Sequence, residues 1–577
     1  MALLCLPWGV PDVSANEAAS EQFAKLLDEM WEFELRESPL FATSVGDHRF
    51  DDRLKSVSLA DSERRNKAQE AFLQRLEAID REQLEPDDRM NHDIMSRQLR
   101  DDLAEHRFGS HLTPVTQRSG FHISFPELPQ DVPLHTAAEH ENYIARLRAF
   151  GSYADGHMEL MRAGIGAELV LPAVVLEGWE ATVDAQIVDD PTESLFYKPF
   201  LKFPATVAAN EHARLRKEAS EAIAGVIVPT YQRFRRFMSE EYVPRARSSI
   251  GASALPGGRD FYRHRVRKYT TLDTTPEEVH QIGLAEVKRI RGEMDEIIRR
   301  VEFDGDFAAF TTFLREDPQF YAKTSEELLK EVAFVLKTMD GQLPTLFGSL
   351  PRMTYGVREV PAYVAPRSTA AYYERPSGDG TKAGFFFMNT YNLSSRPLYT
   401  VAALSLHEAV PGHHLQIALQ QELEDLPNFR RYSGFTAFVE GWALYAERLG
   451  LEVGIYDDPY SDFGRLTMEV WRAGRLVVDT GIHYFGWTRQ QAIDFLTDNS
   501  AMSAHNIRAE VDRYISWPGQ ALAYKTGEMK IRELRALAEK QLGENFDIRE
   551  FHDVVLRSGG IPLDVLEANV KAWLETK

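Results

Sequence analysis

The sequence predicts a mainly α-helical protein with one small β-sheet, and three observations support this. Long stretches place apolar residues three or four positions apart, which is the period of a helix that buries one face. One segment, residues 355–396, is instead rich in proline, glycine and aromatic residues and has the short apolar runs of strands. Hydrophobic residues make up 44% of the 577 residues and charged residues 27%, which is the balance of a globular chain with a large core.

Helical periodicity recurs in order along the chain. The predicted helices are residues 17–37, 62–79, 90–103, 139–163, 206–238 and 276–301. The start of the last helix is the best defined boundary, because Thr275 can cap it, Pro276 fits its first position and Glu278 completes a capping box. Later in the chain, the runs 359–364 and 384–391 are typical of strands on either side of a glycine-containing turn.

The chain divides into a leader and two predicted lobes. Residues 1–15 are apolar and end like a signal cleavage site, but they lack a basic start, so we expect an unstructured leader or a signal remnant. Residues 16–250 form the predicted N-terminal helical lobe and residues 251–577 the C-terminal lobe with the chemistry, joined near residues 245–269 around one cleft. If these residues are a trimmed signal, the protein is expected to be periplasmic or secreted. If they are not, it is expected to be cytoplasmic.

Composition excludes several partners and sites. With 66 basic and 88 acidic residues the formal net charge is −22, which disfavours nucleic acid as a partner. The single cysteine, Cys5, excludes an internal disulfide and a cysteine-ligated metal, so a metal site must use histidines and carboxylates. No apolar run reaches the roughly 18–20 residues that span a bilayer. The oligomeric state is not indicated by the sequence.

The segment with the clearest chemistry lies inside an apolar helical pattern at residues 401–423. His407-Glu408 begins the H-E-x-x-H pattern of zinc peptidases, but Pro411 stands where the second histidine belongs. A six-residue step turns a helix by roughly 240°, so His413 can join His407 only if the helix is broken, as Pro411-Gly412 would allow. His414 returns to the same face but lies roughly 10 Å along the axis. Spacing alone therefore leaves the second ligand open.

A third metal ligand is expected from the next helical segment, residues 438–447. Glu440 lies among apolar residues after a Ser433-Gly434 turn, and an ionised carboxylate in that setting needs a cation. Glu447 follows seven residues later on the same helix and is expected to support a ligand from behind. Glu440 is therefore the stronger candidate for the third ligand.

The sequence resembles the bacterial domain of unknown function 885 family, whose signature is similar to H-E-A-x-P-G-H-H-x-Q followed by F-x-E-G-W-A-x-Y-x-E. Residues 39–46, 384–389, 475–483 and 514–527 extend the resemblance over nearly the whole chain. Membership implies a mostly helical zinc-dependent peptidase similar to the gluzincin oligopeptidases and carboxypeptidases, with a small sheet beside the active-site helix and a deep cleft. Those relatives carry Gly-His in the second half of the zinc helix, which favours His413.

These expectations combine into one site. Zinc (Zn²⁺) is expected on His407, His413 and Glu440, with Glu408 as the base that takes a proton from water and returns it to the leaving amine. Tyr514, Tyr524 and His483 are available as the donor that stabilises the oxyanion. Arg513-Tyr514 resembles the Arg-Tyr pair of related dicarboxypeptidases, which favours Tyr514, with His483 as a second donor.

The remaining candidates concern the substrate, expected to be a peptide or peptide-like molecule. Arg513 and Lys525 are expected to pair with a substrate carboxylate, and Tyr524 to contact the substrate. The strand at residues 385–388 is expected to offer an edge to an extended peptide.

Two other functions stay open at this point. A zinc-dependent amidase or esterase acting on non-peptide substrates would use the same four residues and differ only in its pocket. A catalytically silent metal-binding protein would keep the ligands but would have no use for Glu408 beside them.

Overall fold

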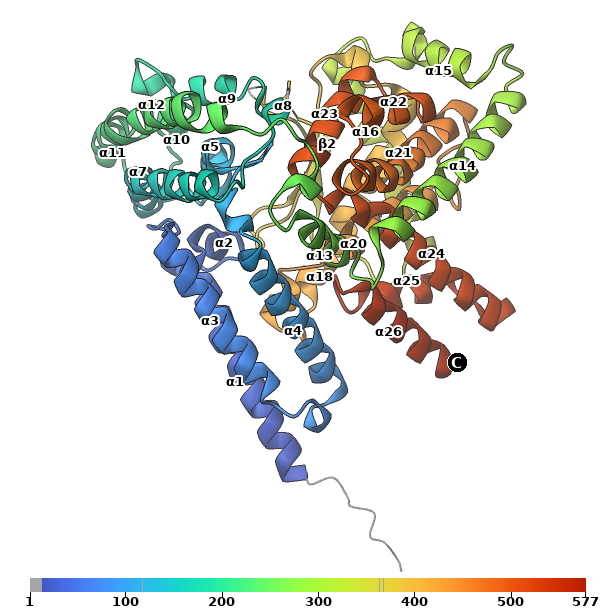
Figure 1. The fold of residues 1–577 in the computed structure, drawn as a ribbon, viewed down its shortest axis with the longest axis horizontal. Helices are drawn as coiled ribbons and strands as arrows, with labels where there is room; N and C mark the ends of the chain where they lie inside the picture. The colour runs from blue at the N-terminus through green and yellow to red at the C-terminus, as the bar shows by residue number, and fades with distance from the viewer. Residues whose placement is uncertain (1–12, 117, 363, 367) are drawn as a thin grey trace, which may run out of the picture.

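The computed structural model describes residues 13–577 apart from residues 117, 363 and 367, and it is mainly helical with a three-stranded sheet, as predicted (Figure 1). The predicted leader lies outside the described residues as far as residue 12. Its last three residues begin the first helix, α1, which starts at Val13.

The helices of the N-terminal half include all five predicted before residue 250. The element predicted at 206–238 consists of α11 and α12, joined by a π-helical stretch at Ile223–Ile227. The helices are α1 (Val13–Glu37), α2 (Pro39–Ser44), α3 (Leu59–Glu77), α4 (Pro86–Arg107), α5 (Phe121–Ser124), α6 (Leu128–Asp131), α7 (Ala137–Gly166), α8 (Ala173–Leu176), α9 (Glu180–Asp184), α10 (Lys198–Leu201), α11 (Ala209–Ala222) and α12 (Val228–Phe237).

The C-terminal half begins with a helix inside the segment predicted to join two lobes. The capping box expected before α14 is present, because Glu278 N–H donates to Thr275 Oγ1 (3.2 Å) and Thr275 N–H donates to Glu278 Oε2 (2.9 Å). The helices are α13 (Gly258–Thr270), α14 (Pro276–Arg300), α15 (Phe307–Glu316), α16 (Ser325–Leu346), α17 (Val401–Glu408), α18 (His413–Glu422), α19 (Asn428–Arg431), α20 (Thr436–Leu449), α21 (Pro459–His483), α22 (Arg489–Asn499), α23 (Ala504–Ser516), α24 (Ala523–Leu542), α25 (Ile548–Leu556) and α26 (Leu563–Glu575).

The sheet has the order β1-β3-β2, with β1 (Tyr355–Glu359) parallel to β3 (Gly384–Met388) and β2 (Ala371–Glu374) antiparallel to it. The strand predicted at 359–364 is wrong beyond its first residue. Pro361 has no N–H for a ladder, and its carbonyl accepts from Val364 and Ala365 in a turn. The expected free edge at residues 385–388 is also wrong, because β3 is the central strand and pairs on both sides.

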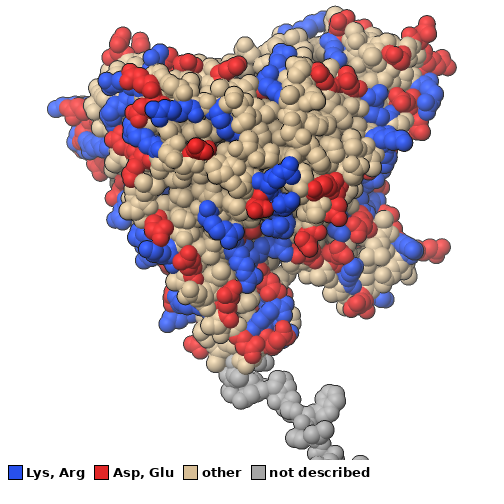
Figure 2. Space-filling view, in the orientation of Figure 1, with Lys and Arg blue, Asp and Glu red and all other residues tan. Residues whose placement is uncertain are grey.

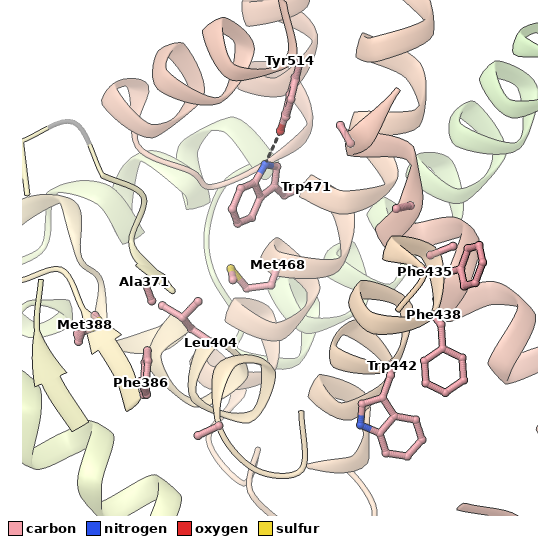
Figure 3. Close-up of a cluster of buried hydrophobic side chains, with 14 of the residues drawn as sticks. Ala371, Phe386, Met388, Leu404, Phe435, Phe438, Trp442, Met468, Trp471 and Tyr514 are labelled. Atoms are coloured by element: carbon pink, nitrogen blue, oxygen red, sulfur yellow. Dashed lines mark hydrogen bonds between the residues drawn. The ribbon is translucent and has the colours of Figure 1, made fainter. Parts of the chain in front are cut away.

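A buried apolar cluster holds the sheet against the helices that carry the candidate site (Figure 3). Phe386 on β3 and Leu404 on α17 belong to it, as do Trp442 on α20 and Trp471 on α21. The same cluster extends from Ile94 to Leu574, so residues on both sides of position 250 share one core. Helices that are remote in sequence are thereby fixed around α17.

The surface carries both signs of charge. On the face in Figure 2, aspartate and glutamate are interspersed with lysine and arginine. Within the part of the chain that the structure describes, no helix is both long enough and apolar enough to cross a membrane.

Candidate metal site

The site begins at α17, whose eight residues are all buried. This burial explains the nearly continuous apolar run 401–406, because a helix surrounded by other elements has no polar face. The helix ends in His407 and Glu408, so the two polar side chains of the motif emerge where the buried helix stops. The next helix, α18, begins at His413.

The break between these helices occurs at Pro411-Gly412, the two residues predicted to allow it. Proline cannot donate the backbone hydrogen bond that a continuing helix needs. A Cβ atom added to Gly412 would lie 1.9 Å from the carbonyl oxygen of His407, so only glycine permits this close return of the chain. The indole N–H of Trp442 donates to the Pro411 carbonyl oxygen (2.8 Å), which ties the break to α20.

The break brings three possible ligands together. Nε2 of His407 and Nε2 of His413 lie 3.5 Å and 3.4 Å from Oε2 of Glu440, which projects from α20. One ligand atom from each of the three residues lies within 4.8 Å of the others. The two imidazole rings are nearly perpendicular (83°), with their centres 4.8 Å apart. Two nitrogen atoms and one carboxylate oxygen therefore converge on one point.

The donor set and its spacing fit zinc. Ligand atoms about 2.0–2.1 Å from one zinc ion at tetrahedral angles are about 3.4 Å apart, which matches both nitrogen–oxygen distances. Oε2 of Glu440 and Nδ1 of His413 are buried without a hydrogen-bond partner among the described residues. A buried carboxylate oxygen in that state calls for a cation or a donor.

Glu447 supports His407 from behind, on the side away from Glu440. Nδ1 of His407 donates to Oε1 of Glu447 (2.8 Å), and that oxygen also lies 3.2 Å from Nη2 of Arg472 on α21. A hydrogen bond at Nδ1 leaves the lone pair on Nε2, which is the atom facing Glu440. The carboxylate therefore sets the tautomer that a metal ligand requires.

The electrostatics of the three residues favour a cation between them. Burial disfavours a charged imidazole, but the nearby carboxylate of Glu440 and the hydrogen bond with Glu447 outweigh it and raise the pKa of His407 to about 9. Burial acts against an ionised Glu440, yet the neighbouring His413 and His407 hold the pKa of its carboxyl well below its usual range. A proton and a metal ion would compete for the same nitrogen atoms.

Glu408 is the last residue of α17 and is 8% exposed. Burial raises the pKa of its carboxyl, and the nearby His407 and His413 act in the opposite direction. It lies beside the three converging ligand atoms without being one of them. A partly desolvated carboxylate in that place is chemically suited to accept a proton.

His414 points to the sheet instead of toward Glu440. Its Nδ1 is 2.9 Å from the hydroxyl of Tyr373 on β2, and its Nε2 is 3.0 Å from the carbonyl oxygen of Met353. Its ring also packs on Tyr355 of β1, with centres 4.8 Å apart. Of the two histidines that spacing left open, the structure thus brings His413 to the other ligands and uses His414 to join α18 to the sheet.

Tyr524, at the start of α24, lies close to these possible ligands. Its ring is nearly parallel to that of His407 (14°), with centres 6.3 Å apart, and its side chain is partly exposed. Helix α24 packs closely against α20 at Gly527. A Cβ atom at this position would lie 1.9 Å from the Ala437 carbonyl oxygen, so the close packing requires glycine. The Tyr524 hydroxyl accepts a long hydrogen bond from Gln520 (3.5 Å).

Tyr514 and His483 have placements that differ from the roles expected of them. The Tyr514 hydroxyl is buried and accepts from Nε1 of Trp471 and Nε of Arg475, both at 2.9 Å (Figure 3). His483 is fully buried, with Nδ1 accepting from Ala252 N–H and Nε2 at 3.0 Å from the Tyr514 carbonyl oxygen. Burial lowers the pKa of His483 to about 3. Its two nitrogens link three backbone segments.

Lys525 and Arg513, expected to meet a substrate carboxylate, are held by carboxylates of the protein. Nζ of Lys525 is fully buried and lies 2.8–3.0 Å from three carboxylates, those of Glu286, Glu469 and Glu528. Arg513 donates to Glu510 (3.0 Å) and to Gln520. Lys525 therefore has no exposed atom to offer a substrate. Arg513 is one of several arginines around Glu510.

Sequence reasoning missed the other charged residues of this region. Arg472 and Arg475 lie on α21, of which every residue from Phe463 to His483 is buried. Glu510 comes from a distant segment and pairs with both Arg475 and Arg118 only in the fold. The sequence of α21 carried little signal for them, because it mixes charged and apolar residues as a helix with one solvent-exposed face does, whereas the fold buries both faces.

Comparisons with known proteins agree with the architecture. A family model described as "Bacterial protein of unknown function (DUF885)" matches residues 39–570. A solved structure described as a "putative lipoprotein" from Colwellia psychrerythraea is 30% identical, with a TM-score of 0.91, and the match covers 98% of this chain and 100% of that one. A "putative lipoprotein of unknown function" from Shewanella oneidensis is 18% identical, with a TM-score of 0.64 and coverage of 95% and 99%, which shows the fold alone. No curated protein matches.

Proposed function

The chain belongs to the DUF885 family of bacterial proteins, and we propose that it is a zinc-dependent hydrolase that cleaves peptide bonds. One observation carries the proposal: Nε2 of His407, Nε2 of His413 and Oε2 of Glu440 converge at zinc-like spacing, and Glu408 follows His407 in the chain. Three protein ligands leave a fourth position free, which is the arrangement of catalytic zinc. A purely structural site closes that position.

The residues divide the work of hydrolysis among them. Zinc bound to the three ligands would supply Lewis acidity and make a water molecule easier to deprotonate. Glu408 accepts the proton of the attacking water and returns it to the leaving amine nitrogen. Glu447 keeps His407 in the tautomer whose Nε2 carries the lone pair.

An oxyanion forms when water adds to the scissile carbonyl, and it needs a neutral donor. Tyr524 is better suited than Tyr514, because its hydroxyl lies on a partly exposed side chain that contacts His407. The Tyr514 hydroxyl already accepts two hydrogen bonds inside the core. We therefore assign oxyanion stabilisation to Tyr524 and a positioning role to Tyr514.

The test compares Glu408→Gln with the parent protein. Glutamine keeps the shape of the side chain but cannot accept the proton, so turnover of a peptide library should fall by roughly 100-fold or more. Zinc content should stay at about one ion per chain, since Glu408 is not a ligand. Glu424→Gln, which changes an exposed glutamate after the end of α18, is the matched control and should keep full turnover.

Two results would overturn the proposal. Parent-like peptide cleavage by zinc-loaded Glu408→Gln would remove the base from the mechanism. Full activity in protein stripped of metal by a chelator would remove the metal. If the parent cleaves simple esters or non-peptide amides but no peptide in the library, the amidase or esterase alternative replaces peptide hydrolysis.

A further inference from the structure

Three arginines from different segments meet around one glutamate near the candidate metal site. Oε2 of Glu510 on α23 lies 3.0 Å from Nη2 of Arg475 on α21 and 3.0 Å from Nη2 of Arg513 on α23. Nη1 of Arg118, from the loop before α5, is 3.8 Å from the other carboxylate oxygen. We call Arg118, Arg475 and Arg513 the arginine cluster.

The charges of this group do not balance. Three guanidinium groups face a single carboxylate, although Arg475 and Glu510 are 3% exposed and Arg513 is 11% exposed. Nη1 of Arg475 and Oε1 of Glu510 have no hydrogen-bond partner among the described residues. Burying uncompensated positive charge is expensive, so the group is suited to receive a further anion.

Arg118 is the member that a ligand can reach. Its side chain is 24% exposed, and its Nη2 donates a hydrogen bond to Thr369 Oγ1 (3.1 Å). Burial and the charges of Arg513 and Arg475 lower its pKa, whereas Glu510 raises it. An anion beside Arg118 would relieve that repulsion and could also reach Nη1 of Arg475.

The cluster lies one side chain away from the proposed zinc ligands. The guanidinium carbon of Arg475 is 4.2 Å from the ring centre of Tyr524, and that ring centre is 6.3 Å from the ring of His407. The guanidinium carbon of Arg475 therefore lies no further from the ring centre of His407 than the sum of these two distances. About three residues of extended peptide span that length. A peptide held at the metal could therefore extend one to three residues and end at the cluster.

We propose that the arginine cluster binds an ionised carboxylate of the substrate, and that this is the free C-terminal carboxylate of a peptide cleaved within three residues of its end. The inference rests on the proposed hydrolase function. Guanidinium groups bind carboxylates through paired N–H donors, and a carboxylate adds one negative charge to a group with an excess of positive charge. Arg118 and Arg475 would contact the ligand, while Glu510 and Arg513 hold them in place.

The experiment uses the zinc-loaded full chain and a peptide pool made in two forms, one with free C-termini and one amidated. Free acids should be cleaved roughly 10- to 100-fold faster in kcat/KM, the factor expected for a hydrogen bond to a charged group. All cuts should fall within three residues of the C-terminus. The same pool should contain peptides with aspartate or glutamate replaced by asparagine or glutamine, because a side-chain carboxylate has the same chemistry.

Arg118→Gln should lower kcat/KM for free acids much more than for amidated peptides and so remove the preference for free acids. Arg118→Lys keeps the charge without the paired donors, so it should restore part of the preference. Arg162→Gln, on α7, is the matched control, because it breaks a surface ion pair with Glu241 and should leave the preference intact. Thermal unfolding of each variant identifies any that fail to fold.

Equal cleavage of free-acid and amidated peptides by the parent would overturn the inference. A preference that follows internal aspartate or glutamate and is lost in Arg118→Gln would keep the carboxylate site but assign it to a side chain. If no peptide is cleaved, the proposed function fails, and calorimetric binding of the free-acid and amidated pools to the parent then decides this inference alone. Equal affinities would overturn it.

Discussion

Nδ1 of His407 donates to Oε1 of Glu447 across 2.8 Å, although the two residues are 40 positions apart. Glu447 lies two turns after Glu440 on α20, so both carboxylates are on the same face of that helix. Glu440 approaches Nε2 of His407 and Glu447 approaches Nδ1. Helix α20 therefore supplies both the proposed ligand Glu440 and the residue, Glu447, that orients the imidazole of His407.

This relationship predicts unequal effects of two substitutions on zinc binding. Glu440→Ala removes a proposed ligand and should abolish stoichiometric zinc binding. Glu447→Ala removes only the hydrogen bond that sets the tautomer of His407, and the loss of such a partner typically costs 10- to 100-fold in metal affinity. Competition with a chromophoric chelator measures both affinities. Equal zinc affinity in Glu440→Ala and the parent would transfer the ligand role to another residue.

The adjacent histidines should separate in the same assay. His413→Ala should lose zinc, because its Nε2 faces Glu440. His414→Ala should keep zinc but lower the free energy of unfolding by about 1–3 kcal/mol, since the Tyr373 hydroxyl and the Met353 carbonyl lose a buried partner. Urea denaturation gives the stability. Zinc loss in His414→Ala with retention in His413→Ala would reverse the assignment.

The two tyrosines should differ in which property they change. Tyr524→Phe should lower kcat by roughly 100-fold, as expected for the loss of an oxyanion donor, with little change in stability. Tyr514→Phe should instead destabilise the fold by about 1–3 kcal/mol, because Trp471 N–H and Arg475 lose their acceptor. Steady-state kinetics and denaturation on both variants provide the comparison. A large kcat loss confined to Tyr514→Phe would return the role to that residue.

Buried neutral histidines predict that the protein loses stability in acid. His552 on α25 is fully buried, and burial lowers its pKa from 6.5 to about 3. Between those values the unfolded chain binds a proton here and the folded chain does not. The free energy of unfolding should therefore fall as pH falls below 6.5, by about 1.4 kcal/mol per pH unit for this group.

His552→Gln should reduce the slope of unfolding free energy against pH by about 1.4 kcal/mol per pH unit. This holds even if the variant is less stable than the parent at every pH. Urea denaturation at several pH values between 7.5 and 5 measures the slope. His135→Gln, which changes an exposed histidine, should leave the slope unaltered. An unchanged slope in His552→Gln would show that another group controls the acid response.

Local sequence determined much of the architecture and the position of the metal motif. Apolar periodicity predicted the helices, and Thr275, Pro276 and Glu278 marked the start of α14, because caps and periodicity act within a few residues. Strands were predicted less well: β2 was missed, and the run at 359–364 is mostly a turn. Short apolar runs do not reveal pairing partners, and β1 exists because β3 lies beside it.

Tertiary structure decided the remaining features of the site. The sequence spacing of the histidines could not show whether His413 or His414 faces His407. The direction of the chain after Pro411 depends on the hydrogen bond from Trp442 of α20 and on the close approach of Gly412 to the His407 carbonyl oxygen. The surroundings of Tyr524 and Tyr514, and the pairing of both Arg118 and Arg475 with Glu510, depend on contacts between segments far apart in the chain. Sequence therefore determined which side chains were available for chemistry, whereas packing of distant helices determined which of them meet, since distances between such segments are not encoded in local periodicity.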